Sequence, residues 1–450
     1  MNGNSNKVSL SEKLCYAIGS GGGNIITCIV GYYMAAYYTD SVGMAAATVG
    51  TILLLVRIFD GITDVIMGSI IDKTTTKWGK SRPWLFLSGF LCAIGLSMAF
   101  GVPEALGEHA KLVYVVLTYV FLNCVAYTAL MVSHTSMMSR ITLDNHERSV
   151  MSSMNQIANQ IGSILVTVLT VRIATDYGWN KAAIFFGIIA GITIIISAIG
   201  TREHLGENAN GEIHVEKVDL KKAVPAMLHN KYFWLLAIVF VLVLIMNIAN
   251  GGSTYYFCNI VLGNADLMAP LTVAGVIPAI IINFFVTPLT DKFGVRNTMV
   301  MGAVTAIIGF LIMGLAGTNY TLIMIGYVLK GLGCGPIFTC GFALAAAVVD
   351  YGEWKFGIRS EGLINSCVSF GQKVGNGLGS AASSWILAIG GYVGTAAVQS
   401  ASAISAIRFA FSYFGAILGV LMLIVCLMFD IDKHMDKVHA DLAKKMAQQA

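Results

Sequence analysis

Apolar segments of similar length recur along the whole chain, separated by short polar stretches. Each holds roughly 20 or more residues with few charges, the length that an α-helix needs to cross the hydrocarbon core of a bilayer. The pattern predicts an all-α membrane protein with twelve transmembrane helices, at residues 13–39, 45–71, 83–102, 111–139, 149–174, 181–201, 232–262, 266–290, 298–316, 320–349, 361–388 and 405–430.

Composition supports this prediction. Of the 450 residues, 56% are hydrophobic and only 12% are charged, and the mean hydropathy is +0.75. Soluble domains carry charge on about a quarter of their residues, so the composition excludes a soluble protein. The nine cysteines lie singly in apolar segments, without the spacing of metal ligands. They are predicted to be buried small hydrophobic side chains.

Basic residues fall mainly on one side of the predicted membrane. If the amino terminus is inside, most of the 28 lysines and arginines lie in inner loops and tails, and the outer side holds only Lys111, Arg172 and Lys181. Positive charge marks the cytoplasmic side. We therefore expect a multi-pass protein of the cell membrane, surrounded by lipid, with both termini in the cytoplasm and no nucleic-acid partner.

The longest polar stretch divides six predicted spans from six. The loops after the second and the eighth span, residues 72–83 and 291–297, each combine an acid at the helix end, an aromatic–Gly pair and an arginine. This repeat predicts two related six-helix bundles, at residues 1–201 and 232–431. A cytoplasmic linker is predicted at residues 202–231 and a cytoplasmic tail at residues 432–450. Two related bundles around a central solute site form the major facilitator fold of secondary transporters.

Three charged side chains interrupt the second apolar segment. Arg57, Asp60 and Asp64 are spaced i, i+3 and i+7, so on a helix they share one face. Ionisable groups inside a membrane are costly and mark a functional site by default. Two carboxylates one turn apart repel, so the pair is predicted to hold a proton or a metal cation such as Na⁺, with the hydroxyls of Thr63 and Thr128 as further ligands. A purely structural ion pair is the alternative, but one arginine does not neutralise two acids.

The same stretch, Arg57–Gly68, followed by Trp78–Trp84, resembles the signature of the glycoside-pentoside-hexuronide:cation symporters. Further motifs in both halves are similar to that family, namely Tyr37–Asp40, Ile141–Arg148, Tyr255–Phe257, Leu262–Asp266, Val349–Lys355 and Arg359–Glu361. The resemblance implies a transporter rather than an enzyme, which moves a sugar or glycoside by alternating access and needs no cofactor besides Na⁺ or H⁺ as the coupling ion.

The resemblance also implies roles for individual residues. Asp60 and Asp64 match the cation site of the family, with Thr128 contributing from the fourth helix, and Lys373 matches a lysine of the eleventh helix. We expect Lys373 to pair with both acids when no cation is bound, and Arg57 to take part in the same coupling.

The solute site departs from the family pattern. Acids on helices one and four and an arginine on helix five hold the sugar in a well-known member, and the matching positions here are Asn24, Met131 and Gln156. Together with Tyr127 and Lys373 they form the predicted solute site. The loss of these charges leaves two solute classes open, a sugar or glycoside and another small polar solute.

Two further residues have two interpretations each. His134 is suited to hydrogen bonding between helices and also to work on a solute or proton. Lys330 is suited to helix packing, because Gly331, Gly333 and Gly335 follow it, and equally to solute contact. A membrane enzyme is disfavoured, since the sequence holds no metal-ligand motif, no nucleophile–base pair and no phosphate-binding glycine loop. A monomer is expected to suffice for transport.

Overall fold

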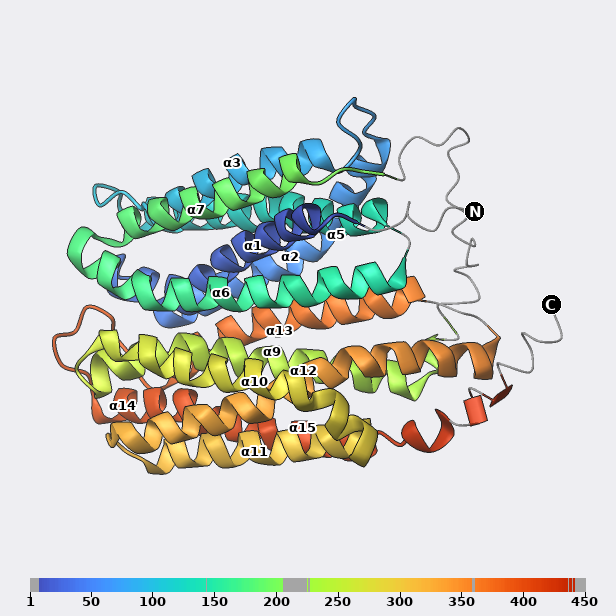
Figure 1. Cartoon of the computed structure of the whole chain (residues 1–450). Helices are drawn as coiled ribbons and strands as arrows, with labels where there is room; N and C mark the ends of the chain where they lie inside the picture. The colour runs from blue at the N-terminus through green and yellow to red at the C-terminus, as the bar shows by residue number, and fades with distance from the viewer. Residues whose placement is uncertain are drawn as a thin grey trace. The chain divides into compact units, whose positions relative to one another are not determined.

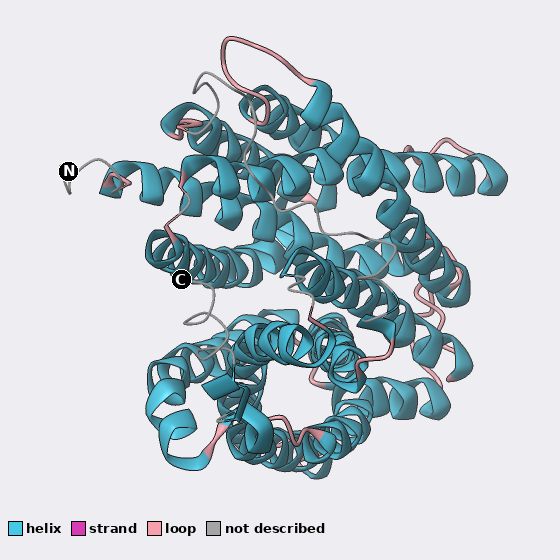
Figure 2. Cartoon of the chain, turned by 90° about the vertical axis from the view of Figure 1, so that its right-hand side faces the viewer, coloured by secondary structure: helices cyan, strands magenta, loops and turns pink. Residues whose placement is uncertain are grey.

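The computed structural model describes residues 8–142, 144–204, 225, 227–357, 361–435, 437–438 and 440–441. Within these residues the secondary structure is helical, apart from one isolated bridge between Thr76 and Gly79 (Figures 1 and 2). The elements are α1 (Leu10–Ala36), η1 (Tyr37–Ser41), α2 (Ala46–Lys73), α3 (Arg82–Ala99), α4 (Glu108–Val120), η2 (Phe121–Tyr127), α5 (Thr128–Ile141), α6 (Asn145–Tyr177), α7 (Trp179–Gly200), α9 (Lys231–Tyr256), η3 (Phe257–Val261), η4 (Ala265–Leu267), α10 (Met268–Phe293), α11 (Val295–Leu315), α12 (Tyr320–Phe356), α13 (Glu361–Ile389), α14 (Ala401–Arg408), η5 (Phe409–Tyr413) and α15 (Phe414–Met428).

Ten helical segments of the described chain are long and apolar enough to cross a membrane. Helices α2 and α13 account for the other two predicted spans, with 28 and 29 residues. At about 1.5 Å per residue both are long enough for a bilayer. In α2 the charged side chains of Arg57, Asp60 and Asp64 interrupt the apolar sequence. The predicted all-α membrane fold is confirmed.

The chain forms two compact units. Unit 1 comprises Met1–Gly211 with Asn264–Ala269 and Val393–Gln399, and unit 2 comprises Glu212–Gly263, Pro270–Tyr392 and Ser400–Ala450. The boundary near residue 211 lies outside the described residues, as do most of the predicted linker and tail and residues 359 and 360 of one family motif. The predicted limits of bundles, linker and tail therefore stay predictions.

Each unit has the same pattern of neighbouring helices. In unit 1, α1 packs against α6 and α7, and α3 packs against α7 (Figure 1). In unit 2, α9 packs against α13 and α15, and α11 packs against α15. Counted within each unit, these are the first span with the fifth and sixth, and the third span with the sixth. The matching pairs support the internal repeat that the two loops suggest.

The nine cysteines are free thiols. All except Cys15 are buried, as predicted for small hydrophobic side chains. One of them, Cys124, donates weakly from Sγ to the carbonyl oxygen of Val56 at 3.6 Å and so joins η2 to α2.

In unit 1 the loop that precedes α3 is tied to the end of α7. The carboxylate of Glu203, just after α7, accepts hydrogen bonds from the backbone N–H groups of Lys80, Ser81 and Arg82 at 3.0, 2.7 and 3.2 Å. In return, Nε of Arg82 donates to the carbonyl oxygen of Ala198 at 3.0 Å. The N–H groups at one helix start and the carbonyls at another helix end thereby gain partners of matching charge.

Unit 2 repeats this arrangement with different residues. Asp432 accepts from the backbone N–H of Arg296 at 3.0 Å, and Nη2 of Arg296 donates to the carbonyl oxygen of Leu427 at 2.8 Å. Gly79 and Gly294 stand before these helices with φ of 103° and 82°. These positive φ values favour glycine, and a Cβ on either would also lie within 3.2 Å of the capping carboxylate. The two matched loops therefore have the same structural role.

An ion pair joins the start of α1 to the start of α6. Nζ of Lys13 lies 2.6 Å from Oε2 of Glu147, and the backbone N–H of Val8 donates to the same oxygen at 3.3 Å. The hydrogen bond from Lys13 is the main cause that lowers the pKa of Glu147 below its ordinary value of 4.5. Lowering the pH protonates Glu147 and therefore weakens this ion pair.

We expect part of the stability of the protein to titrate with Glu147. Because its pKa is lower in the folded than in the unfolded chain, its stabilising effect is fully present above pH 4.5 and is lost as the pH falls through the folded-state pKa. Thermal unfolding in detergent over this range measures the effect. Glu147→Gln should flatten the dependence of the apparent Tm on pH, whereas Glu108→Gln, at an exposed position of α4, should not. Parallel curves for wild type and Glu147→Gln would contradict the assignment.

Candidate functional site

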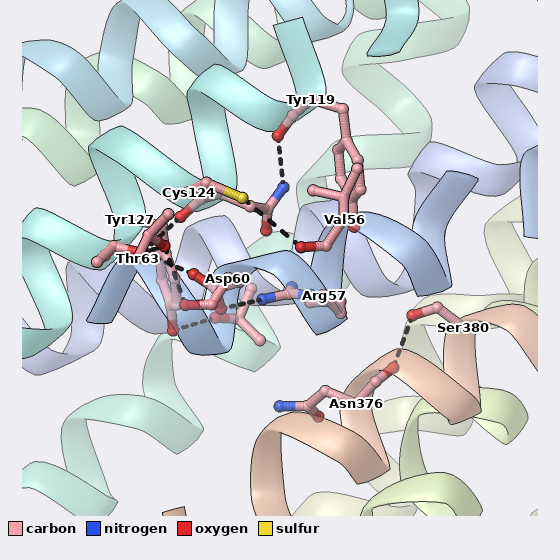
Figure 3. A network of polar contacts seen from close by, with 12 residues as sticks. Val56, Arg57, Asp60, Thr63, Tyr119, Cys124, Tyr127, Asn376 and Ser380 are labelled. Atoms are coloured by element: carbon pink, nitrogen blue, oxygen red, sulfur yellow. Dashed lines mark hydrogen bonds and ion pairs between the residues drawn. The ribbon is translucent and has the colours of Figure 1, made fainter. Parts of the chain in front are cut away.

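The carboxylate of Asp60 is buried in the middle of α2, against the fourth span of unit 1. The residue is 1% exposed. Oγ1 of Thr128 donates to Oδ1 of Asp60 at 2.6 Å, and Nη1 of Arg57 lies 4.0 Å from Oδ2 (Figure 3). Oγ1 of Thr63 lies 3.3 Å from Oγ1 of Thr128. The structure thus brings together three of the four predicted cation ligands, with the predicted coupling arginine beside them.

The position of Thr128 depends on an irregular stretch of backbone. Phe121–Tyr127 form the π-helix η2 between α4 and α5, and the backbone N–H of Thr128 bonds to the carbonyl of Asn123, five residues earlier. Such π segments inside helices are frequent at functional sites. The hydroxyl of Thr128 lies 3.0 Å from the same carbonyl. A hydroxyl has one hydrogen, so it bonds either to Asp60 or to Asn123, and the shorter distance favours the carboxylate.

Asp64 lies one turn further along α2 on the same face and is partly exposed. The formal charges of Arg57, Asp60 and Asp64 sum to −1, so one proton or one Na⁺ would make the group neutral. Carboxylate and hydroxyl oxygens are the ligands that hard cations prefer. The arrangement suits one monovalent cation.

Tyr127 connects this cluster to α1. Its hydroxyl lies 2.7 Å from Oγ1 of Thr27. The guanidinium carbon of Arg57 lies 6.0 Å from the centre of the Tyr127 ring, and both of these side chains are drawn in Figure 3. Thr27 is not among the residues predicted from the sequence. Its spacing of three residues from Asn24 was the available signal, because i and i+3 share a helix face.

Asn24 is held between α1 and α6. Its Nδ2 donates to the carbonyl oxygen of Asn159 at 2.6 Å and to Oγ of Ser163 at 2.8 Å. The two helices approach closely, because a Cβ on Gly162 would lie only 2.9 Å from the carbonyl oxygen of Gly21. The third acceptor, Sγ of Cys28 in α1, is more distant at 3.5 Å, so the two shorter contacts to α6 use the two hydrogens of the Asn24 amide, and its oxygen is the part suited to a solute hydroxyl.

Three other residues of the predicted solute site lie on α5, α6 and α13. Met131 on α5 is 39% exposed, and Gln156 on α6 is also exposed. Lys373 lies on α13 in unit 2 and is partly exposed. Its predicted pairing with Asp60 and Asp64 stays a prediction.

His134 joins α5 to α1. Its Nε2 donates to the carbonyl oxygen of Tyr16 at 3.0 Å, and the hydroxyl of Tyr16 donates to the carbonyl oxygen of His134 at 2.9 Å. The two rings are stacked, with centres 4.0 Å apart and planes at 16°. Since a carbonyl oxygen only accepts, Nε2 carries a proton in this bond. Of the two interpretations of His134, the structure favours hydrogen bonding between helices.

We expect His134→Gln to leave the dependence of transport on pH unchanged, because the glutamine amide supplies an N–H donor in place of Nε2. His134→Leu should lower the stability by about 1–2 kcal/mol, since both the donor and the ring stacking are lost. Uptake rates across a pH series and the apparent Tm in detergent measure the two effects. A pH profile displaced by about one unit in His134→Gln would assign this residue to proton work instead.

Lys330 is bonded inside unit 2. Its Nζ donates to Oδ1 of Asn250 at 2.6 Å and lies 5.1 Å from the centre of the Tyr327 ring. Nδ2 of Asn250 in turn donates to the carbonyl oxygen of Phe411 at 2.7 Å. These contacts join α12, α9 and η5, which favours the packing interpretation of Lys330.

Known proteins are similar to the whole chain. The sequence model of the family described as MFS/sugar transport protein matches residues 15–433. An isoprimeverose transporter from Lactiplantibacillus pentosus is 30% identical, with 99% of this chain and 93% of that protein covered. A glucuronide carrier protein homolog from Escherichia coli (strain K12) is 27% identical, with 87% and 86% covered.

Solved structures share the fold. A bacterial homolog of the human lysosomal transporter Spinster, in an inward-facing and unoccupied conformation, superposes with a TM-score of 0.65 at 13% sequence identity, and 97% of each chain is covered. At this identity the likeness concerns the fold alone. These relatives and neighbours are membrane transporters rather than enzymes.

Proposed function

The chain belongs to the MFS/sugar transport protein family, a family of multi-pass membrane transporters, and we propose that it moves a sugar or glycoside across the membrane together with Na⁺ or H⁺. The observation that carries the proposal is the buried carboxylate of Asp60, held by Thr128 and Arg57 in the middle of a membrane-length helix. Burying a carboxylate at this depth costs free energy, and such a residue in a membrane-spanning helix marks a functional site by default.

Cation binding at Asp60 and Asp64 is proposed to drive the transport cycle. With a formal charge of −1 on Arg57, Asp60 and Asp64 together, closing the protein around the empty group leaves a charge in a medium of low dielectric constant. One bound cation removes that penalty. The solute site begins next to this group, at Tyr127. Coupling then follows from linkage, because each ligand raises the affinity for the other by the same factor.

The class of solute is supported by the relatives and by polar groups of α1 and η2. The printed names of two relatives specify isoprimeverose and a glucuronide. Asn24 offers its amide oxygen and Tyr127 its hydroxyl, both suited to the hydroxyl groups of a sugar. Another small polar solute is the second candidate, because Met131 and Gln156 carry no charge. We also propose that both termini lie in the cytoplasm, on the basis of the basic inner loops.

Uptake into vesicles that contain the purified full-length protein tests the proposal. Labelled isoprimeverose, a labelled glucuronide and a panel of labelled amino acids are offered under an imposed Na⁺ gradient, an imposed pH gradient, and neither. We expect one of the sugars to accumulate only under one of the two gradients. Accumulation of an amino acid alone would favour the second solute class. Sugar uptake that ignores both gradients would overturn cation coupling.

A further inference from the structure

Thr27, like Tyr16 at the bonds to His134, is a point at which α1 is hydrogen-bonded to the fourth span, and of these two it is the one next to the cation-site threonine. Its Oγ1 donates to the carbonyl oxygen of Gly23, one turn earlier in α1, at 3.2 Å. Either hydroxyl can donate in the 2.7 Å contact between Thr27 and Tyr127. When Thr27 donates to Gly23, the tyrosine O–H donates and Thr27 accepts. In both directions the bond from Tyr127 to α1 depends on the hydroxyl of Thr27.

Tyr127 and Thr128 are adjacent in sequence and bond to different helices. Tyr127 reaches α1 through Thr27, and its neighbour Thr128 reaches α2 through the 2.6 Å bond to Asp60. One backbone segment, the end of η2 and the start of α5, therefore has one side chain on the cation site and the next on α1. Arg57 lies between them, 4.0 Å from the carboxylate of Asp60 and 6.0 Å from the centre of the Tyr127 ring.

A cation on Asp60 changes the forces on both of these side chains. Neutralised Asp60 attracts the guanidinium of Arg57 less, so Arg57 keeps the side chain of Tyr119 and the ring of Tyr127 as its neighbours. The hydroxyl of Thr128 then has the carbonyl of Asn123, at 3.0 Å, as its other acceptor. Both changes act on the end of η2, and the Thr27 bond passes them to α1.

Building on the proposed function, we propose that Thr27 is a positioning residue that transmits cation occupancy of Asp60 to the solute-binding face of α1. Asn24 lies one turn from Thr27 on that face and is anchored to α6. The Thr27–Tyr127 bond therefore sets how α1, and with it the Asn24 amide, sits relative to the cation site. Among the described residues, the hydrogen bonds of Thr27 go to Gly23 and Tyr127 and not to Asp60, so its effect on the cation site is indirect.

Amide hydrogen exchange of α1 tests this assignment without knowledge of the solute. The full-length protein is compared in NaCl, at acid pH, and in a sodium-free alkaline buffer, for peptides that cover α1 and α2. In the wild type we expect one of the two cations to change the exchange of α1 by about fivefold, the equilibrium ratio that one intramolecular hydrogen bond supplies. Thr27→Val, which keeps the shape and removes the acceptor, should abolish that change on α1 and leave the change on α2.

Two further variants separate positioning from simple destabilisation. Thr27→Ser restores the hydroxyl and should restore the response of α1. Thr170→Val removes a buried hydroxyl that bonds only within its own helix, to the carbonyl oxygen of Val166, and should respond as the wild type does. A wild-type response on α1 in Thr27→Val overturns the assignment, and so does a wild type in which cations affect α2 but not α1.

The outcomes also separate this inference from the proposed function. If no sugar is taken up but the response of α1 to cation still requires Thr27, the solute class is wrong and the role of Thr27 stands. If sugar uptake is cation-driven and α1 does not respond, the role of Thr27 alone is wrong.

Discussion

Vesicles that contain Asp60→Asn are expected to equilibrate solute across the membrane but not to concentrate it. Asparagine keeps the size of the side chain and an oxygen for the 2.6 Å bond from Thr128, but it neither takes up a proton nor offers a charge to Na⁺. In the wild type, a potential of 100 mV on one co-transported charge is worth about 2.3 kcal/mol, which corresponds to accumulation of about 50-fold. In the variant the ratio of inside to outside concentration should be about 1.

Asp72→Asn is the matched control for this experiment. Asp72 lies at the end of the same helix, its side chain is 77% exposed, and its carboxylate is 3.6 Å from Nη2 of Arg140. The chemical change is identical, but it takes place outside the apolar part of α2. We expect accumulation close to that of the wild type. If Asp60→Asn concentrates solute as the wild type does, Asp60 is a structural residue and the driving cation binds elsewhere.

Replacing Glu203 by alanine should produce a large loss of stability in unit 1. The carboxylate is 4% exposed and accepts from three backbone N–H groups, and its Oε2 lies 3.8 Å from Nη1 of Arg140. Without it, the start of α3 keeps buried donors without acceptors, and Arg140 loses a counter-charge. We expect a destabilisation of about 3–5 kcal/mol, measured as unfolding in mixed detergent micelles.

Conservative and remote variants sharpen the test of Glu203. Glu203→Gln keeps the shape and one acceptor oxygen, so the loss should be about 1–2 kcal/mol. Glu104→Ala changes an exposed glutamate of a loop and should alter the stability by less than about 0.5 kcal/mol. Equal unfolding of Glu203→Ala and Glu104→Ala would mean that the N–H groups before α3 find other acceptors and that the contact between the two ends is incidental.

Local properties of the sequence predicted the helices and the charges well. Length and hydropathy located every span, because the bilayer sets a common length for all of them. The spacing of Arg57, Asp60 and Asp64 placed them on one face of α2, since a helix has a fixed period. The polar loops at residues 72–83 and 291–297 also indicated the repeat, although nothing in them identifies Glu203 or Asp432 as the capping acids.

Contacts between distant segments could not be predicted in this way. The bond between Thr27 and Tyr127 joins residues 100 positions apart, and the bonds of Glu203 to the start of α3 span more than that. His134 illustrates the same point, because its two interpretations differ only in what lies opposite its ring. The position of Asn24 in the sequence also fits a solute site, yet the N–H groups of its amide bond to α6.

By itself, the sequence determined that the chain is a multi-pass helical membrane protein and that α2 carries its ionisable cluster, because hydropathy and helical period are properties of a single segment. Only the tertiary structure decided which oxygens meet at Asp60 and that Thr27 joins α1 to them. These contacts depend on η2, the π-helical stretch after which Tyr127 bonds to α1 and Thr128 bonds to α2. Hydrogen bonds are directional and short, so residue type and spacing along one helix do not reveal which helices will face each other.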